Sequence, residues 1–235
     1  MSDSFRDSLT TLNEQGERMW VFAKKPTGYF HNLRVLVAIV CLTIFFTMPF
    51  IKVNGHPLVL INVFERNFIF FGTAFWPQDF NILLLAMLSF FVFIILFTAV
   101  FGRVWCGWTC PQTVFMEMVF RKIEYWIEGD YKQQQKLVVQ DWDIEKIYKK
   151  SFKQILFMVV SLVISHTVMA YIIGVDGVWK LISGSPFNDL SGFFGLMFFT
   201  TFFYVVFAHM REIVCTVICP YGRLQGVLMN KDTIQ

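Results

Sequence analysis

Long apolar segments alternate with charged stretches along this chain. Four segments have, or nearly have, the roughly 20 apolar residues that a helix needs to cross a bilayer: Val35–Ile51, Phe80–Phe101, Ile155–Val175 and Leu190–Ala208. The first is short and carries Pro49 near its end, where we expect an irregular last turn because proline breaks helical hydrogen bonding. The pattern predicts an all-α membrane protein with four transmembrane helices.

Two cysteine motifs of the same form follow the second and fourth apolar segments. Residues 106–111 (CGWTCP) and 215–220 (CTVICP) are 109 positions apart, and the same offset relates Pro77 to Pro186. Each half of the chain therefore has a span, an outer loop, a second span and a CxxxCP motif. This order predicts two parallel repeats related by an axis along the membrane normal, with the two motifs opposite one another at the same depth.

The repeat divides the chain into four parts. Residues 1–34 form a polar N-terminal arm, 35–128 the first two-helix repeat, 129–151 a charged, partly helical connector, and 152–235 the second repeat. Proline favours the first position of a helix, so we expect a short interfacial helix after each motif. In the first of these, polar residues recur every three or four positions, as in a helix that lies on the membrane surface or packs over the bundle: Thr113, Glu117, Arg121, Glu124 and Glu128.

Charge gives the expected topology. The chain is 56% hydrophobic and 16% charged, and only three of its 20 Lys and Arg residues lie in the segments 52–79 and 176–189. Positive charge favours the cytoplasmic side of a membrane, so we place both ends of the chain and both motifs in the cytoplasm. The net charge of +3 does not indicate binding to nucleic acid.

The motifs contain four of the five cysteines: Cys106, Cys110, Cys215 and Cys219. Thiols stay reduced in the cytoplasm, and four converged thiolates suit a copper ion or an iron–sulfur cluster; the spacing does not decide between these. Plain packing is the alternative reading, which we adopt for Cys41. The candidate groups around a bound centre are His209, Met210, Arg103 and Arg211, with space filling or membrane anchoring as the alternative.

Several longer motifs resemble those of the FixG/RdxA family, also called CcoG, the cytochrome c oxidase accessory proteins. They are the segments 66–72 (RNFIFFG), 76–78 (WPQ), 102–113 (GRVWCGWTCPQT), 127–130 (IEGD) and 211–220 (REIVCTVICP). The resemblance covers nearly all of residues 20–232. The CxxxCP motif alone is less specific, because related membrane ferredoxin-type proteins of nitrate and nitrous oxide respiration share it.

The resemblance implies a multi-pass protein of the bacterial inner membrane that helps to assemble the C-type haem–copper oxidase. It implies a cupric reductase, which converts Cu(II) to Cu(I), and places copper ahead of a cluster at the four cysteines. The implied partners are the lipid bilayer, a cytoplasmic electron donor, oxidase assembly proteins and copper transporters; a homodimer stays open. An iron–sulfur electron-transfer subunit and a non-enzymatic assembly scaffold also stay open.

Family members continue into a cytoplasmic module with two [4Fe–4S] clusters. This chain stops at Gln235 and contains no C-x₂-C-x₂-C run of the kind that holds such a cluster. We therefore expect the 1–235 fragment to bind the ion but to turn over poorly.

Overall fold

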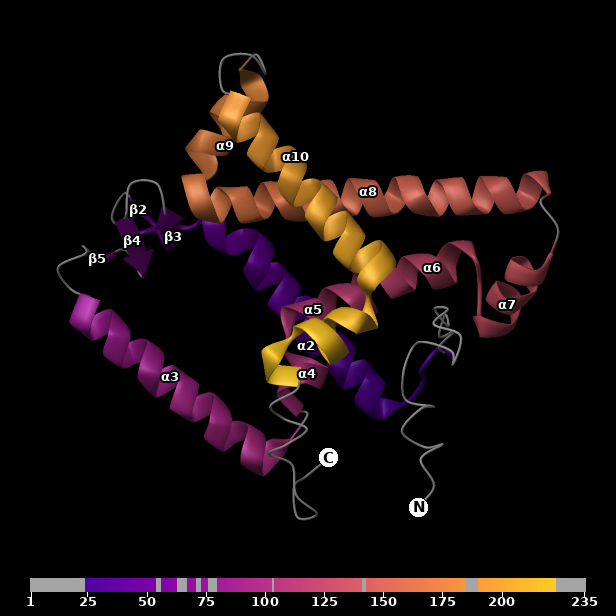
Figure 1. The fold of residues 1–235 in the computed structure, drawn as a ribbon, viewed down its shortest axis with the longest axis horizontal. Helices are drawn as coiled ribbons and strands as arrows, with labels where there is room; N and C mark the ends of the chain where they lie inside the picture. Colours follow the sequence, from indigo (N-terminus) through magenta and orange to yellow (C-terminus); the bar gives the residue numbers. More distant parts are fainter. Residues whose placement is uncertain are drawn as a thin grey trace.

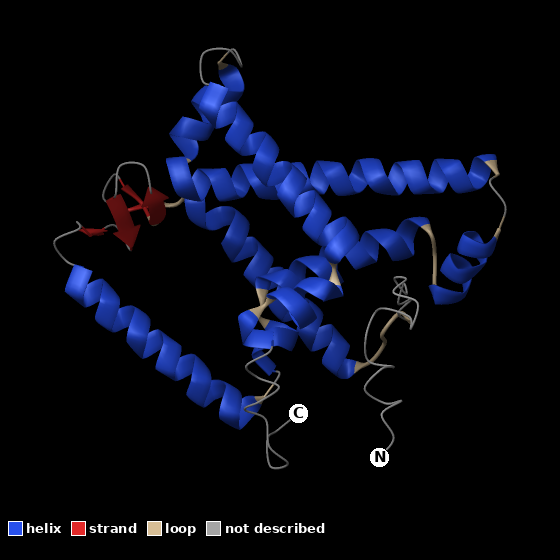
Figure 2. Ribbon diagram, in the orientation of Figure 1, coloured by secondary structure: helices blue, strands red, loops and turns tan. Residues whose placement is uncertain are grey.

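The computed structural model describes residues 24–53, 56–62, 67–70, 73–75, 80–102, 104–140, 143–184 and 190–222. Within these residues the chain is mostly helical, and long helices cross around several short ones near the middle of the molecule (Figure 1). A small β region lies at one end, drawn in red in Figure 2.

The first long helix begins where the polar arm meets the membrane. Helix α2 runs over Tyr29–Thr47 and is continued by a 3-10 turn, η1, at Met48–Phe50. Pro49 lies inside this turn and is buried. Because proline has no N–H to donate, the α-helical hydrogen bonding stops here, and the irregular last turn expected from the sequence is confirmed.

Three described helical stretches are long and apolar enough to cross a bilayer: Tyr29–Phe50, Ile144–Ile173 and Leu190–Met210. The second is helix α8, and the third is helix α10, Leu190–Tyr204, continued by a π-helical turn, η4, at Val205–Met210. The protein is therefore membrane-associated through apolar helices. Helix α3, Phe80–Phe101, has the bounds predicted for the second segment, but its described apolar part, Leu84–Thr98, is shorter. A fourth span and the two-repeat layout stay predictions.

Helix α3 runs along the edge of the molecule, apart from α8 and α10 (Figure 1). Its apolar side chains are largely exposed, and Leu85 and Met87 are 71% and 73% exposed. A contiguous apolar surface of this kind is typical of contact with lipid or with another protein. The helix therefore offers most of its surface to surroundings outside this chain.

In the described residues between α2 and α3 there are five short strands, which the all-α prediction did not include. They are β1 Lys52–Val53, β2 His56–Pro57, β3 Val59–Asn62, β4 Asn67–Phe70 and β5 Thr73–Phe75. Strands β3, β4 and β5 form an antiparallel sheet in that order, and β1 pairs with β2. β-branched and aromatic residues favour strands, and runs this short carry no signal for a membrane helix. The fold class is corrected to a helical protein with a small sheet.

The core forms around the helix that follows the first cysteine motif. This helix comprises α5 Pro111–Val114, the π-helical turn η3 Phe115–Phe120 and α6 Arg121–Ile127. Phe120, only 2% exposed, stacks on Phe207 of η4 and meets Phe157 of α8 edge-on, with ring centroids 4.8 and 4.9 Å apart. The predicted helix exists, and its first half is buried against the other helices, as in the expected alternative of a helix that packs over the bundle.

The connector between the predicted halves is helical in part, as expected. Helix α7, Tyr131–Val139, begins at Asp130, and α8 begins after Asp143; each aspartate accepts a hydrogen bond from the next backbone N–H. Helix α8 then runs through the boundary predicted at residues 151/152 without a break. It ends at Gly174, whose φ of 80° suits glycine, and α9, Val175–Ser183, follows.

Candidate functional site

The first cysteine motif joins two short helices. Cys106 lies in helix α4, Val104–Trp108, and the chain becomes extended at Cys110, with φ −57° and ψ 123°. The Cys110 N–H donates to the Trp105 carbonyl oxygen at 3.1 Å. Pro111 then begins α5 at a position where its missing N–H costs nothing. Cys110 is thus held at the start of a helix by its own backbone.

The second motif has the same backbone arrangement. Cys215 lies in a π-helical turn, η5, at Val214–Ile218, and the chain is extended at Cys219, with φ −70° and ψ 115°. The Cys219 N–H donates to the Val214 carbonyl oxygen at 2.8 Å. Val214 and Cys219 are the residues that the 109-residue offset matches to Trp105 and Cys110. The two motifs therefore share a local structure despite their different intervening residues.

A backbone residue with positive φ precedes each motif at the same offset. It is Gly102 in the first half, with φ 55°, and Arg211 in the second, with φ 42°. Glycine adopts this conformation freely, whereas a residue with a Cβ does so at a cost of order 1 kcal/mol. Arg211 is the one non-glycine residue with positive φ in the described part of the chain. Interactions of its side chain must offset this strain.

The Arg211 side chain lies in a buried ion-pair network. Both terminal guanidinium nitrogens donate to the Glu124 carboxylate, and Arg211 Nη1 is 3.0 Å from Oε2. Glu124 is only 6% exposed. Lys153 of α8 lies 3.3 Å from Glu124 and 2.6 Å from Glu128. A two-nitrogen guanidinium–carboxylate pair fixes direction as well as distance, so α6 orients the turn before the second motif.

A second branch of the network joins Arg121, on the helix after the first motif, to Glu212, the residue that follows Arg211. Arg121 pairs with Glu117 on its own helix and donates to Glu212 Oε1 at 2.6 Å. The helix after the first motif is therefore tied to Arg211 and to Glu212, which lie shortly before the helical turn of the second motif. The sequence revealed this polar stripe but not its partners, because residues about ninety positions away cannot be identified from periodicity.

The thiols of the two motifs are electrostatic neighbours. None of the five cysteines forms a disulfide, and all five are partly exposed. Burial raises the pKa of the Cys215 thiol, and the negative charges of Cys110, Cys219 and Glu212 raise it further. Cys110 belongs to the other motif, so the fold brings the motifs together, as Figure 1 also shows for the C-terminal segment beside α4 and α5. Among the described residues, no three His, Cys, Asp or Glu side chains are grouped as a site for one metal ion.

Helix α3 is joined to the residue after the second motif. Thr98, fully buried, lies 2.7 Å from the Tyr221 hydroxyl. Because the Thr98 hydroxyl donates to the Ile94 carbonyl at 2.6 Å, the Tyr221 hydroxyl is the donor in this pair. The bond holds the C-terminal end of α3 beside the second motif.

The other predicted site residues lie in different surroundings. His209 is exposed, and its ring packs against Tyr204 on the same helix, with centroids 5.7 Å apart. Met210 ends η4, and Arg103 lies outside the described residues. Cys41 lies within α2. Roles for His209, Met210, Arg103 and Arg211 toward a bound centre stay predictions.

Comparison with known families points to an iron–sulfur protein. A family model described as a 4Fe-4S binding domain matches residues 83–131 and 191–231. Each matched stretch contains one CxxxCP motif and most of the apolar segment before it. The match therefore covers both halves of the candidate site.

Curated relatives extend over almost the whole chain. Protein RdxB and Protein RdxA of Cereibacter sphaeroides are each 32% identical to it, over 95% and 91% of its length. Nitrogen fixation protein FixG of Rhizobium meliloti is 30% identical over 93%. The chain spans less than half of these relatives, 48%, 46% and 42% respectively. They are members of the FixG/RdxA family, which confirms the resemblance found in the sequence. No solved structure matches the chain.

Proposed function

We propose that this chain is a membrane-bound electron-transfer unit in which Cys106, Cys110, Cys215 and Cys219 hold one [4Fe–4S] cluster at the cytoplasmic membrane face. The observation that carries the proposal is that Cys110, 105 positions away in the sequence, lies close enough to Cys215 to raise the pKa of its thiol. When bound, such a cluster takes up and releases single electrons.

The chemistry of the donors supports a cluster ahead of a single copper ion. A [4Fe–4S] cluster takes one thiolate on each iron, so its ligands are neighbours that do not meet at one point. A single Cu(I) ion needs its sulfur ligands around one point. Cys215 lies near Cys110 and Cys219, and the 4Fe-4S family match includes both motifs. This reverses the order expected from the sequence, and direct copper binding becomes the second candidate.

The surrounding residues have a positioning role in this proposal. The backbone leaves the helical conformation at Cys110 and Cys219, so the second cysteine of each motif lies at the end of the helical turn that carries the first. The pairs Arg211–Glu124 and Arg121–Glu212 hold the second motif against the helix that follows the first. Rigid positioning of this kind keeps ligands in place when the charge of a centre changes.

For the whole protein we propose reduction of Cu(II) to Cu(I) for assembly of the C-type haem–copper oxidase. Copper is then a substrate: one electron from a cytoplasmic donor converts one Cu(II) to one Cu(I). The support is the family resemblance, together with a thiol-rich site in a reducing compartment, where soft ligands favour Cu(I). The cytoplasmic placement follows from the distribution of Lys and Arg.

A chelator assay tests this activity. Cu(II) and a reductant are supplied to the whole protein and to the 1–235 chain, and Cu(I) is followed with a coloured chelator. We expect catalysed reduction by the whole protein, slow reduction by the 1–235 chain, and loss of the activity of the whole protein when Cys110 is replaced by Ser. Reduction no faster than in buffer would favour the assembly scaffold. Equal rates for both proteins would show that electrons do not enter through a further module.

A further inference from the structure

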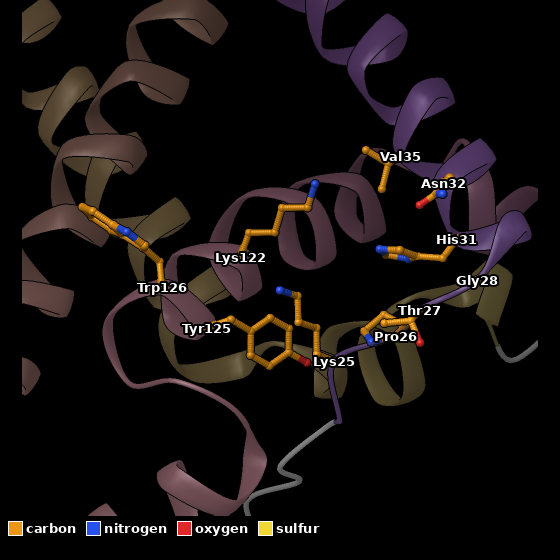
Figure 3. Close-up of a pocket in the computed structure, with 10 residues that line it drawn as sticks. All are labelled: Lys25, Pro26, Thr27, Gly28, His31, Asn32, Val35, Lys122, Tyr125 and Trp126. Carbon is orange, nitrogen blue, oxygen red and sulfur yellow. The ribbon is translucent and has the colours of Figure 1, made fainter.

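A cavity of about 800 Å³ lies between the start of α2 and the helix α6. One wall is formed by residues 25–28 together with His31, Asn32 and Val35, and the other by Lys122, Tyr125 and Trp126 (Figure 3). None of these residues belongs to the thiol site or to its ion-pair network. The cavity therefore calls for its own explanation.

Hydrogen-bond donors and positive charge line this cavity. Figure 3 shows the side chains of Lys25, Lys122 and His31 extending into one space from its different sides. None of the ten described residues around it is acidic. Outside the lining, the Asp130 carboxylate accepts hydrogen bonds from the backbone N–H groups of Lys25 and Tyr131, at 3.4 and 2.8 Å. The negative charges of Glu117, Asp130 and Glu124 reach the lining residue Tyr125, and the positive charge of Arg121 opposes them there. The lining thus favours an anion.

The start of α2 adds backbone donors to the same wall. This 19-residue helix begins at Gly28 with φ 145°, and no described side chain caps it. The first N–H groups of a helix have no partner within the helix and carry the positive end of its dipole. Two lysines and these N–H groups are together a setting in which phosphate oxygens bind well. The pKa of Tyr125 is raised, chiefly by burial, so its hydroxyl remains a donor.

The surroundings indicate the depth of the cavity in the membrane. Tyr29, Phe30 and Trp126 are all about three-quarters exposed, and Tyr29 is the first residue of α2. Exposed aromatic rings next to lysines are typical of the headgroup layer of a bilayer. Val35 and Trp126 give the cavity an apolar side for the part of a ligand that lies deeper.

We propose that this cavity binds a phosphate-bearing anion at the membrane surface, as in the headgroup of phosphatidylglycerol. The sources of such a phosphate are an anionic lipid or a soluble phosphate compound. The proposal does not depend on what the cysteines bind.

Native mass spectrometry of the delipidated full chain tests this binding. Phosphatidylglycerol, phosphatidylcholine with the same acyl chains, and inorganic phosphate are added separately in detergent. If lipid is the source, phosphatidylglycerol is retained and phosphatidylcholine is not, and inorganic phosphate does not displace it. If a soluble compound is the source, inorganic phosphate binds by itself and displaces the lipid. Retention of both lipids alike, with no phosphate bound, would overturn the proposal.

Charge variants locate the binding in this cavity. Lys25→Gln with Lys122→Gln should weaken anion retention by roughly tenfold, since each basic group near a membrane surface adds several-fold to binding. Lys132→Gln with Lys136→Gln removes the same charge from exposed positions of α7 and should change retention little. Lys25→Arg with Lys122→Arg keeps the charge and should keep the binding. Equal loss in the α7 variant, or wild-type binding that does not fall with added salt, would contradict a specific phosphate site.

Discussion

Cys215 is the cysteine whose electrostatic surroundings are best defined. Its pKa is raised, first by burial and then by Cys110, Cys219 and Glu212. A thiol must lose its proton to bind a metal or an iron, so protons compete with ligation at this residue. A thiol is already mostly protonated at neutral pH, and the raised pKa keeps Cys215 of the unloaded site protonated to a higher pH than an ordinary cysteine.

The alkylation rate of Cys215 measures this effect directly. In the unloaded protein we expect Cys215 to react with iodoacetamide more slowly at pH 7.5 than the thiol of glutathione. The rate should rise about tenfold per pH unit until the pH passes its raised pKa, because only the thiolate reacts. Peptide mass spectrometry after timed quenching gives the rate for each cysteine separately. A Cys215 rate at pH 7.5 equal to that in the denatured chain would contradict the raised pKa.

At the residue scale, local features could be predicted and distant partners could not. Pro49 and Pro111 act as the sequence suggests, because proline acts through its own ring and missing N–H. The partner of Glu124 is Arg211, 87 positions away, and only the fold brings them together. Likewise, an arginine in the sequence does not indicate a positive φ. The 109-residue offset matches Arg211 to Gly102, and this match could have suggested the positive φ of Arg211.

At the scale of elements, the helix after the first motif organises the site. Its apolar face enters the core through Phe115 and Phe120, and its polar face carries Glu117, Arg121 and Glu124. The charged groups on this face are partly or wholly buried between α8 and the second motif. Removal of one member of a buried pair leaves the other as an uncompensated charge.

Glu124→Gln should therefore destabilise the protein by about 3 kcal/mol, because it removes the carboxylate that pairs with the buried Arg211, whereas Lys153 keeps its pair with Glu128. We expect the melting temperature in detergent to fall by at least roughly 5 °C, followed by tryptophan fluorescence. Glu145→Gln is the matched control, because Glu145 is 66% exposed in its pair with Lys149 and such pairs contribute little. Equal shifts for the two variants would show that the network does not stabilise the fold.

The long elements could be predicted because membrane helices have a simple signal. Helix α3 has the predicted bounds, and the three stretches that qualify as spans contain most of the other apolar segments. Helix ends were harder to place. Helix α8 begins at Ile144 with a charged, amphipathic stretch, and the apolar segment that the sequence revealed comes only after it. The sheet of β3, β4 and β5 was missed because its pairing depends on contacts between separate short runs.

At the scale of the whole molecule, the arrangement in the membrane follows from charge alone and stays a prediction. Seventeen of the 20 Lys and Arg residues lie in the three segments placed in the cytoplasm, 1–34, 102–154 and 209–235. The thiol site is at the same end as these segments. An electron donor in the cytoplasm would then reach the site without crossing the membrane.

Labelling of added cysteines tests this topology. We expect a membrane-impermeant maleimide to label Lys180→Cys, in α9, in intact spheroplasts, because α9 follows the outer end of α8. Lys132→Cys, in α7, should be labelled only after the membrane is opened. The unsubstituted chain gives the background from the five native cysteines. Labelling of Lys132→Cys and not of Lys180→Cys in intact spheroplasts would invert the topology, and with it the side of the thiol site.

The central claim is that four cysteines from two distant motifs hold one iron–sulfur cluster. Its most direct test is the iron and acid-labile sulfide content of the anaerobically purified chain, with its visible spectrum. We predict about four irons and four sulfides per chain with broad absorption near 400 nm. The centre should be lost in Cys106→Ser, Cys110→Ser, Cys215→Ser or Cys219→Ser, and kept in Cys41→Ser. Stoichiometric Cu(I) without iron, or an iron content that none of the four substitutions lowers, would contradict the claim.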